Sequence, residues 1–111
     1  MELKEAFGQT LRAVRHGKGL TQEDFALVSS RTNVSLLERG GTIPTLEKME
    51  KLCDLLQVHP VTLVAACYLR KEGQTDIQAF LQKVASELLL LAQESERYSF
   101  DAEKRAKDSD L

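Results

Sequence analysis

The sequence contains no tryptophan, only two prolines and two cysteines, and no apolar run that approaches the length of a membrane-spanning helix. Two cysteines, Cys53 and Cys67, are too few for a disulfide framework or a cysteine-based metal site. A spanning helix needs about 20 consecutive apolar residues, and no basic and apolar leader opens the chain. These absences predict a cytoplasmic protein with no membrane segment, and 111 residues suffice for one domain with a modest core.

An excess of positive charge is also missing. The chain has 15 Lys and Arg against 17 Asp and Glu, which gives a net charge of −2. Residues 1–73 hold ten basic against nine acidic residues, and residues 74–111 hold five against eight. A strongly basic balance would by itself indicate a nucleic-acid partner. Any such function must therefore be argued here from the positions of particular residues.

The sequence lacks the alternation of apolar and polar residues that is typical of a half-buried strand. Apolar residues recur at helical spacing instead, as Leu3, Phe7 and Leu11 do in the first segment. Capping residues, glycines and a proline divide the chain further. They predict six helices. The first stops at Gly17, the second and third span 21–28 and 30–39, the fourth is capped by Thr45, and the fifth runs from 60 to 72. The sixth spans 75–97 and opens with a Thr75–Gln78 capping box.

The predicted fold is all-α, with a five-helix domain over residues 1–72, a long C-terminal helix over 74–98 and a polar, frayed tail over 99–111. Two apolar stripes are expected to face the core of the domain. They comprise Leu46, Met49, Leu52, Cys53 and Leu56 on the fourth helix, and Val61, Val64, Cys67 and Tyr68 on the fifth.

The segments 21–28 and 30–39 are two short helices with almost no connection between them. Such a pair must cross at a steep angle, which is helix-turn-helix geometry, and its second helix can enter the major groove, about 12 Å wide in B-DNA. Val34 and Leu37 are spaced to face the core. The outward and flanking positions of that helix are rich in groups that bind base edges and phosphates, namely Arg31, Thr32, Asn33, Ser35, Leu36 and Arg39.

Five segments in order carry a family resemblance: GQTLRAVR (8–15), GLTQEDFA (19–26), SRTNVSLLERG (30–40), PTL (44–46) and LLQVHP (55–60). This succession resembles the XRE family, the phage-repressor and Cro-like helix-turn-helix regulators, over residues 6–68. The resemblance implies the repressor-like fold named above.

The resemblance also implies roles for individual residues. Gln22 matches a residue that reaches the phosphate backbone or a base beside the recognition helix. Arg31, Thr32, Ser35 and Leu36 match positions that read bases. Ser30 and the loop at Gly40, Gly41 and Thr42 match donors to phosphate. Arg15 and Glu38 match a largely buried salt bridge that would fix the orientation of the recognition helix.

The sequence departs from the family at one place. Most members have two further residues, including a turn glycine, between the alanine of helix two and the recognition helix. Here residues 26–30 (ALVSS) are compressed and contain no glycine. We interpret this as a shortened helix two, which leaves the first residue of the recognition helix open by one or two positions.

Each candidate residue has a plainer interpretation. Arg31, Thr32, Ser35 and Gln22 could be caps or ordinary polar surface, and Arg12, Lys18 and Arg39 could serve phosphate contact or solubility alone. Cys53 and Cys67 lie on apolar faces, where cysteine behaves as a small buried hydrophobe rather than a redox switch. Neither His16 nor His59 has neighbours at metal-ligand spacing. No residue constellation indicates an enzyme, and no cofactor is implied.

The sixth helix has an apolar stripe that a small domain does not need, and Leu89 and Leu90 widen it. The stripe consists of Ile77, Phe80, Leu81, Val84, Leu88 and Leu91. It either packs back on its own domain or forms a homodimer. We predict a bacterial or phage transcriptional regulator that binds a pseudo-palindromic double-stranded DNA operator as a homodimer. The alternative is an antitoxin or adaptor that uses the leucine face to bind another protein.

Overall fold

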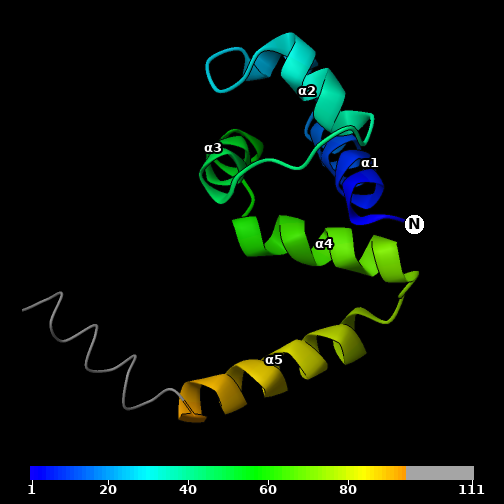
Figure 1. Cartoon of the computed structure of the whole chain (residues 1–111), viewed down its shortest axis with the longest axis vertical. Helices are drawn as coiled ribbons and strands as arrows, with labels where there is room; N and C mark the ends of the chain where they lie inside the picture. The colour runs from blue at the N-terminus through cyan, green and yellow to red at the C-terminus, as the bar shows by residue number, and fades with distance from the viewer. Residues whose placement is uncertain (95–111) are drawn as a thin grey trace, which may run out of the picture. The chain divides into compact units, whose positions relative to one another are not determined.

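The computed structural model describes residues 1–94, which form two compact units, one over Met1–Thr75 and one that begins at Asp76 (Figure 1). The first unit contains α1 (Leu3–Gly17), the short 3₁₀-helix η1 (Gln22–Phe25), α2 (Arg31–Glu38), α3 (Leu46–Leu56) and α4 (Pro60–Glu72). The second contains α5 (Ile77–Glu94). No strand occurs within residues 1–94, so the predicted all-α class is confirmed.

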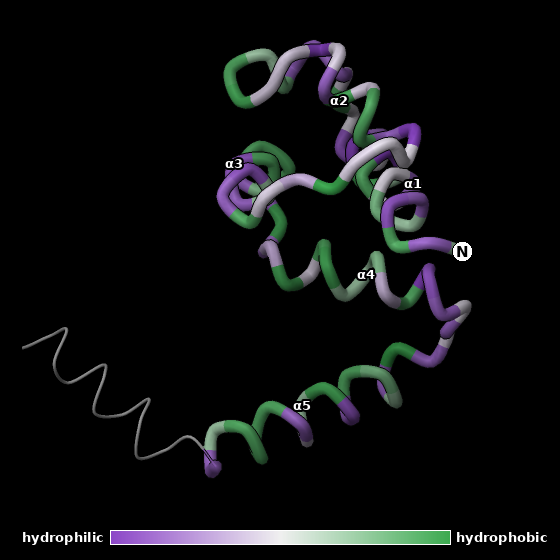
Figure 2. Tube along the Cα trace, viewed as in Figure 1, coloured by the Kyte–Doolittle hydropathy of each residue, from purple (hydrophilic) through white to green (hydrophobic). Residues whose placement is uncertain are grey.

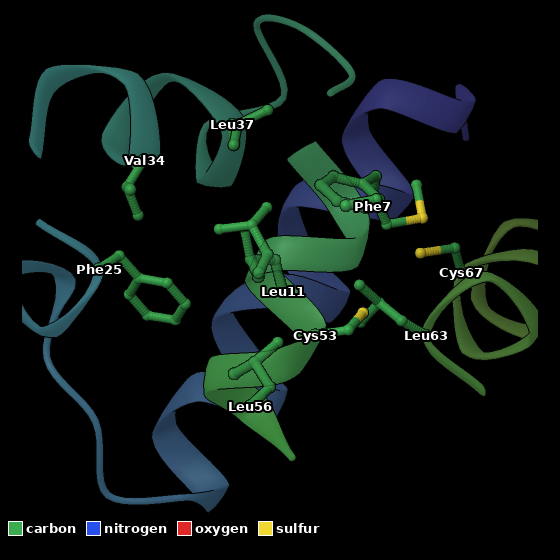
Figure 3. Packing of buried hydrophobic residues seen from close by; sticks show 11 residues of the cluster. Phe7, Leu11, Phe25, Val34, Leu37, Cys53, Leu56, Leu63 and Cys67 are labelled. Carbon is green, nitrogen blue, oxygen red and sulfur yellow. The ribbon is translucent and has the colours of Figure 1, made fainter. Parts of the chain in front are cut away.

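Helix α1 is the centre of the first unit, because it packs against both α2 and α4. Its Phe7 and Leu11 are buried together with Phe25 of η1 and Val34 and Leu37 of α2. Figure 3 shows these side chains converging on the same core as residues of α3 and α4. Helix α2 is thus attached to the rest of the unit by one face, and its orientation is fixed by packing.

The structure corrects the predicted stripes of the fourth and fifth helices. Leu46 is 80% exposed and Val61 is 64% exposed, because each lies in the first turn of its helix, beyond the edge of the core. Leu63 takes the inward position on α4 instead, one helical turn before Cys67, and both are almost fully buried. Tyr68 lies at the rim of the core and is 38% exposed.

The second helix is shorter than the predicted segment 21–28 and is of a different type. It is a single 3₁₀ turn, and the backbone N–H groups of Val28 and Ser29 both bond to the carbonyl oxygen of Phe25. Phe25 must reach the core, where it is fully buried, and Ser30 must be extended to cap α2. Only four residues separate these two requirements, so the chain has no room for a longer α-helix.

The other helix ends follow the predicted chemistry. The Ser30 hydroxyl accepts the N–H of Asn33 at 3.1 Å, and the Thr45 hydroxyl accepts that of Lys48 at 3.1 Å. Gly40 follows the C-terminal end of α2 and has a φ of +78°, a conformation that residues with a β-carbon seldom adopt.

Within residues 1–94 no single helix is long and apolar enough to cross a membrane. Helices α3 and α4, which are bent by 100° relative to each other, meet the same test of length and composition only as a pair.

The start of helix α5 lies one residue later than predicted. Asp76, not Thr75, is its capping residue, and the Asp76 carboxylate accepts the N–H of Ala79 at 2.9 Å. Hydrophobic residues run along most of the helix between polar positions (Figure 2), and none of its residues is buried. The last residues of the predicted segment 75–97, and the predicted frayed tail over 99–111, lie outside the described residues.

Candidate nucleic-acid interface

The outward face of α2 and the start of η1 together form an open hollow. Its walls are the side chains of Gln22, Arg31, Thr32, Ser35 and Arg39. Val34 and Leu37, on the opposite face of α2, are buried in the core. All five wall residues are polar and can donate hydrogen bonds, so the hollow presents a hydrogen-bonding surface on a rigidly held helix.

The remaining predicted contact residues lie around this hollow and do not line it. Leu36 is 38% exposed and lies over the backbone of Gly41, just after the helix. Thr42 follows in the same loop and is half-buried. Ser30 and Asn33 lie at the start of α2, where the Asn33 side-chain amide donates to the Ser29 hydroxyl at 2.5 Å. The structure therefore gives Asn33 a bonding role inside the turn.

Behind the hollow, Arg15 of α1 and Glu38 of α2 form the ion pair that the resemblance implied. Arg15 Nε donates to Glu38 Oε2 at 2.6 Å, a second guanidinium nitrogen donates to Oε1 at 2.9 Å, and both side chains are less than a tenth exposed. Arg15 also donates to the carbonyl oxygen of Leu20 at 2.9 Å. This bidentate contact ties α1, the loop before η1 and the end of α2 into one unit.

A third residue joins this pair, and the sequence did not indicate it. Gln22 Nε2 donates to Glu38 Oε1 at 3.1 Å, which orients the amide of a side chain that also lines the hollow. Burial alone would raise the pKa of Glu38, but the bonds from Arg15 and Gln22 and the charges of Arg15 and Arg12 outweigh burial and hold the pKa below its ordinary value. The pKa of Arg15 is raised, chiefly by its bond to Glu38. Both groups are therefore charged near neutral pH.

Arg31 is not free in the structure. Its Nη1 atom donates to Glu23 Oε1 at 3.1 Å, and the two side chains are 73% and 72% exposed. Glu23 lies in the first turn of η1, where its position alone indicates only an acidic residue at a helix start. The two residues are eight positions apart and on different elements, so the contact depends on how the compressed turn aligns η1 with α2.

The turn itself is held by a residue from outside the motif. Lys48 Nζ, on α3, donates to the carbonyl oxygen of Val28 at 2.6 Å, and the contact is partly buried. This bond occupies a carbonyl oxygen of the compressed turn over residues 26–30. Leu27, at the same turn, is fully exposed. No local pattern in the sequence connects Lys48 with residues 26–30.

The described residues offer neither a metal-binding cluster nor an accessible cysteine thiol. No group of three His, Cys, Asp or Glu side chains within residues 1–94 could hold a metal ion. Burial raises the pKa of both cysteine thiols, Cys53 and Cys67, and the two residues belong to the core. They fill space as apolar side chains, and their thiolates are disfavoured.

Comparison with known proteins places the fold. A family model described as a helix-turn-helix domain matches residues 6–66. In a search of curated proteins no match was found. Among solved structures, the chain is similar to the clp gene regulator ClgR from Corynebacterium glutamicum, with 28% identity, a TM-score of 0.57, and coverage of 61% of this chain and 91% of that one.

Two further solved structures agree. The restriction-modification controller protein C.AhdI from Aeromonas hydrophila is 37% identical, with a TM-score of 0.51 over 54% of this chain and 94% of that one. A second structure of ClgR is 24% identical, with a TM-score of 0.58 over 86% of this chain and 95% of that one, and it supports the fold alone. The family model covers more than half of the chain. The chain therefore belongs to the helix-turn-helix domain family and is of the XRE type, a class of DNA-binding transcriptional regulators.

Proposed function

We propose that this protein regulates transcription by binding a pseudo-palindromic DNA operator as a homodimer, with α2 in the major groove of each half-site. The observation that carries the proposal is the hollow lined by Gln22, Arg31, Thr32, Ser35 and Arg39 on a helix whose opposite face is buried. A helix that is anchored on one side and polar on the other can present several side chains to base edges at once. The location that follows from a DNA partner is the cytoplasm.

The wall residues differ in the contacts they can make. Arg31 can donate two parallel bonds to the O6 and N7 atoms of guanine. Thr32 and Ser35, on the same face, can bond to base edges, and Leu36 can contact a thymine methyl group. Gln22 approaches the same bases or the backbone beside them from η1. Together these side chains would select the sequence.

A second set of residues would fix the register of the helix on the duplex. Ser30, Asn33, Arg39 and Thr42 lie at the two ends of α2 or just beyond them, where donors to phosphate are expected. The first unit has almost no net charge, so each protomer would gain only modest affinity from general electrostatics. Two protomers bound to one operator would double the number of phosphate contacts.

Dimerisation is proposed to occur through α5. Ile77, Leu81, Val84, Leu88 and Leu91 are spaced alternately by four and three residues, which is the heptad spacing of two helices that pair with each other. Phe80 flanks this row. A second copy of the same helix is the partner that such a row fits, because identical heptads match in register. The pair would set two recognition helices for half-sites about 34 Å apart.

Selection of bound fragments from a random duplex library, at one stated salt concentration, tests the proposal. We expect enrichment of a motif with two inverted half-sites whose centres are about one helical turn apart. A library that shows no enrichment over several rounds, with folded protein, would overturn sequence-specific binding. A single half-site without a repeat would overturn the homodimer and leave DNA recognition in place.

A second candidate function rests on the width of the α5 face. Leu89 and Leu90 are 66% and 57% exposed and lie beside the heptad row, so the apolar surface is broader than a two-helix seam. An antitoxin or adaptor would cover this surface with a different protein. Co-purification of one stoichiometric partner from the native host, in place of a homodimer, would favour this function.

A further inference from the structure

Two carboxylates accept hydrogen bonds from side chains that line the hollow proposed to face DNA (the DNA-facing hollow), and their surroundings differ. Glu38 is buried and accepts bonds from both Arg15 and Gln22, so its charge is compensated inside the unit. Glu23 is 72% exposed at the side chain. Among the described residues, Arg31 is the one hydrogen-bond and ion-pair partner of the Glu23 carboxylate. The compensation of this charge therefore depends on where Arg31 points.

Arg31 lies at the boundary between two neighbouring hollows. One is the DNA-facing hollow already described, and the other is lined by Arg15, Thr21, Gln22, Glu23 and Arg31. The bond to Glu23 holds the guanidinium at this boundary. An exposed ion pair of this kind contributes little to folding stability. We therefore consider what the pair of Arg31 and Glu23 does to DNA binding.

The guanidinium of arginine has five N–H donors, and Glu23 Oε1 accepts from one nitrogen, Nη1. The edge formed by Nε and Nη2 stays available, and two parallel donors are what the guanine edge requires. Arg31 can thus bind guanine while it stays bonded to Glu23. A contact between Arg31 and phosphate is less favourable, because it brings the Glu23 carboxylate toward a second negative charge.

On the basis of the proposed function, we infer that Glu23 is a positioning residue that aims Arg31 at a guanine edge and discourages its use as a phosphate contact. Glu23 would thereby lower the affinity for DNA of any sequence and increase the preference for an operator with guanine at the Arg31 contact. This role would also explain how a helix with few basic residues can discriminate among sequences, since its principal cation is kept from binding the backbone of any duplex.

The test compares Glu23→Gln with the wild type and with Glu72→Gln, which removes an equal charge from the exposed end of α4. Binding is measured by fluorescence anisotropy on the selected operator, on an operator whose Arg31-dependent guanine is replaced by adenine, and on a random duplex of equal length. Each measurement is repeated across a salt titration. Melting curves first establish that both variants are folded.

We expect Glu23→Gln to bind the random duplex about threefold to tenfold more tightly, with a salt slope steeper by about one, as for one additional phosphate contact. The penalty for the guanine-to-adenine change should shrink, and Glu72→Gln should match the wild type. The inference is overturned if Glu23→Gln behaves as Glu72→Gln does, or if it tightens binding to all three duplexes by the same factor. A wild-type protein that does not prefer the selected operator would instead overturn the proposed function.

Discussion

The backbone of α1 touches the backbone of α2 at Gly8 and Leu37. A β-carbon added at Gly8 would lie 2.5 Å from the carbonyl oxygen of Leu37 and 2.6 Å from that of Glu38. Neither oxygen belongs to a flexible side chain, so a larger residue would have to move α2. The contact explains why the position next to Phe7 must be glycine for reasons of space.

Gly8→Ala is therefore expected to lower the free energy of unfolding by about 1–3 kcal/mol, as overpacking does in a close-packed interior. Gly17→Ala is the matched control, because no atom lies within 4 Å of a β-carbon there. That change should leave stability unchanged or raise it by about 0.4–1 kcal/mol. Urea unfolding of the two variants measures the difference. Equal stabilities would show that the two helices can separate without cost.

A second prediction concerns Glu38. Glu38→Gln leaves the Arg15 guanidinium buried without an ionic partner, which typically costs about 3–5 kcal/mol. The folded-state pKa of Glu38 is below its ordinary value, so the stabilisation is complete above the ordinary value and is lost as the pH falls through the folded value. The gap in stability between wild type and variant should accordingly narrow below about pH 5.

Urea unfolding at neutral and acidic pH measures this gap. The control is Glu72→Gln, an exposed substitution that should change stability by no more than about 0.5 kcal/mol. If the gap for Glu38→Gln stays constant between neutral pH and pH 3–4, the pair does not make the pH-dependent contribution that its geometry implies.

A third prediction separates base reading from phosphate contact at Arg31. Arg31→Ala should weaken binding to the selected operator by about 1–3 kcal/mol and change binding to random DNA little. Lys71→Ala, near the exposed end of α4, is the control and should leave both affinities unaltered. Competition binding at fixed salt provides the measurement. An equal loss on both duplexes would identify Arg31 as a phosphate contact.

A fourth prediction tests the heptad row of α5. Leu81→Glu combined with Leu88→Glu places two charges in the proposed seam, and the protein should sediment as a monomer. Gln82→Glu with Ser86→Glu adds the same charge to other positions of the helix and should leave a dimer. Sedimentation equilibrium distinguishes the two states. A dimer that persists in the leucine variant would exclude this face as the interface.

Much of the fold could be predicted because the relevant signals are local. Ser30 and Thr45 cap helices where their neighbours in sequence require a cap, and the glycines after α1, α2 and α4 end them. Val34 and Leu37 are buried as their spacing predicts. The errors occur where tertiary structure decides: η1 is cut to a single turn by the opposing needs of Phe25 and Ser30.

The candidate site was predictable only in part, for the same reason. Arg31, Thr32, Ser35 and Arg39 share one side of a helix, so their common face follows from periodicity. The contacts of Glu23 with Arg31 and of Gln22 with Glu38 join different elements. Their existence depends on the angle between η1 and α2, which no spacing rule supplies. The roles of all these residues in DNA binding stay predictions until they are measured.

The bond from Lys48 to the carbonyl oxygen of Val28 bears on how this protein can be engineered. Because the ammonium group comes from α3, η1 and α2 do not hold their turn by contacts of their own alone. If residues 21–39 were transplanted into a foreign scaffold, the carbonyl oxygen of Val28 would lose its bond to Lys48. The orientation of α2 relative to η1 would then no longer be fixed by this contact. A transferable DNA-binding motif from this protein must therefore include α3 as well.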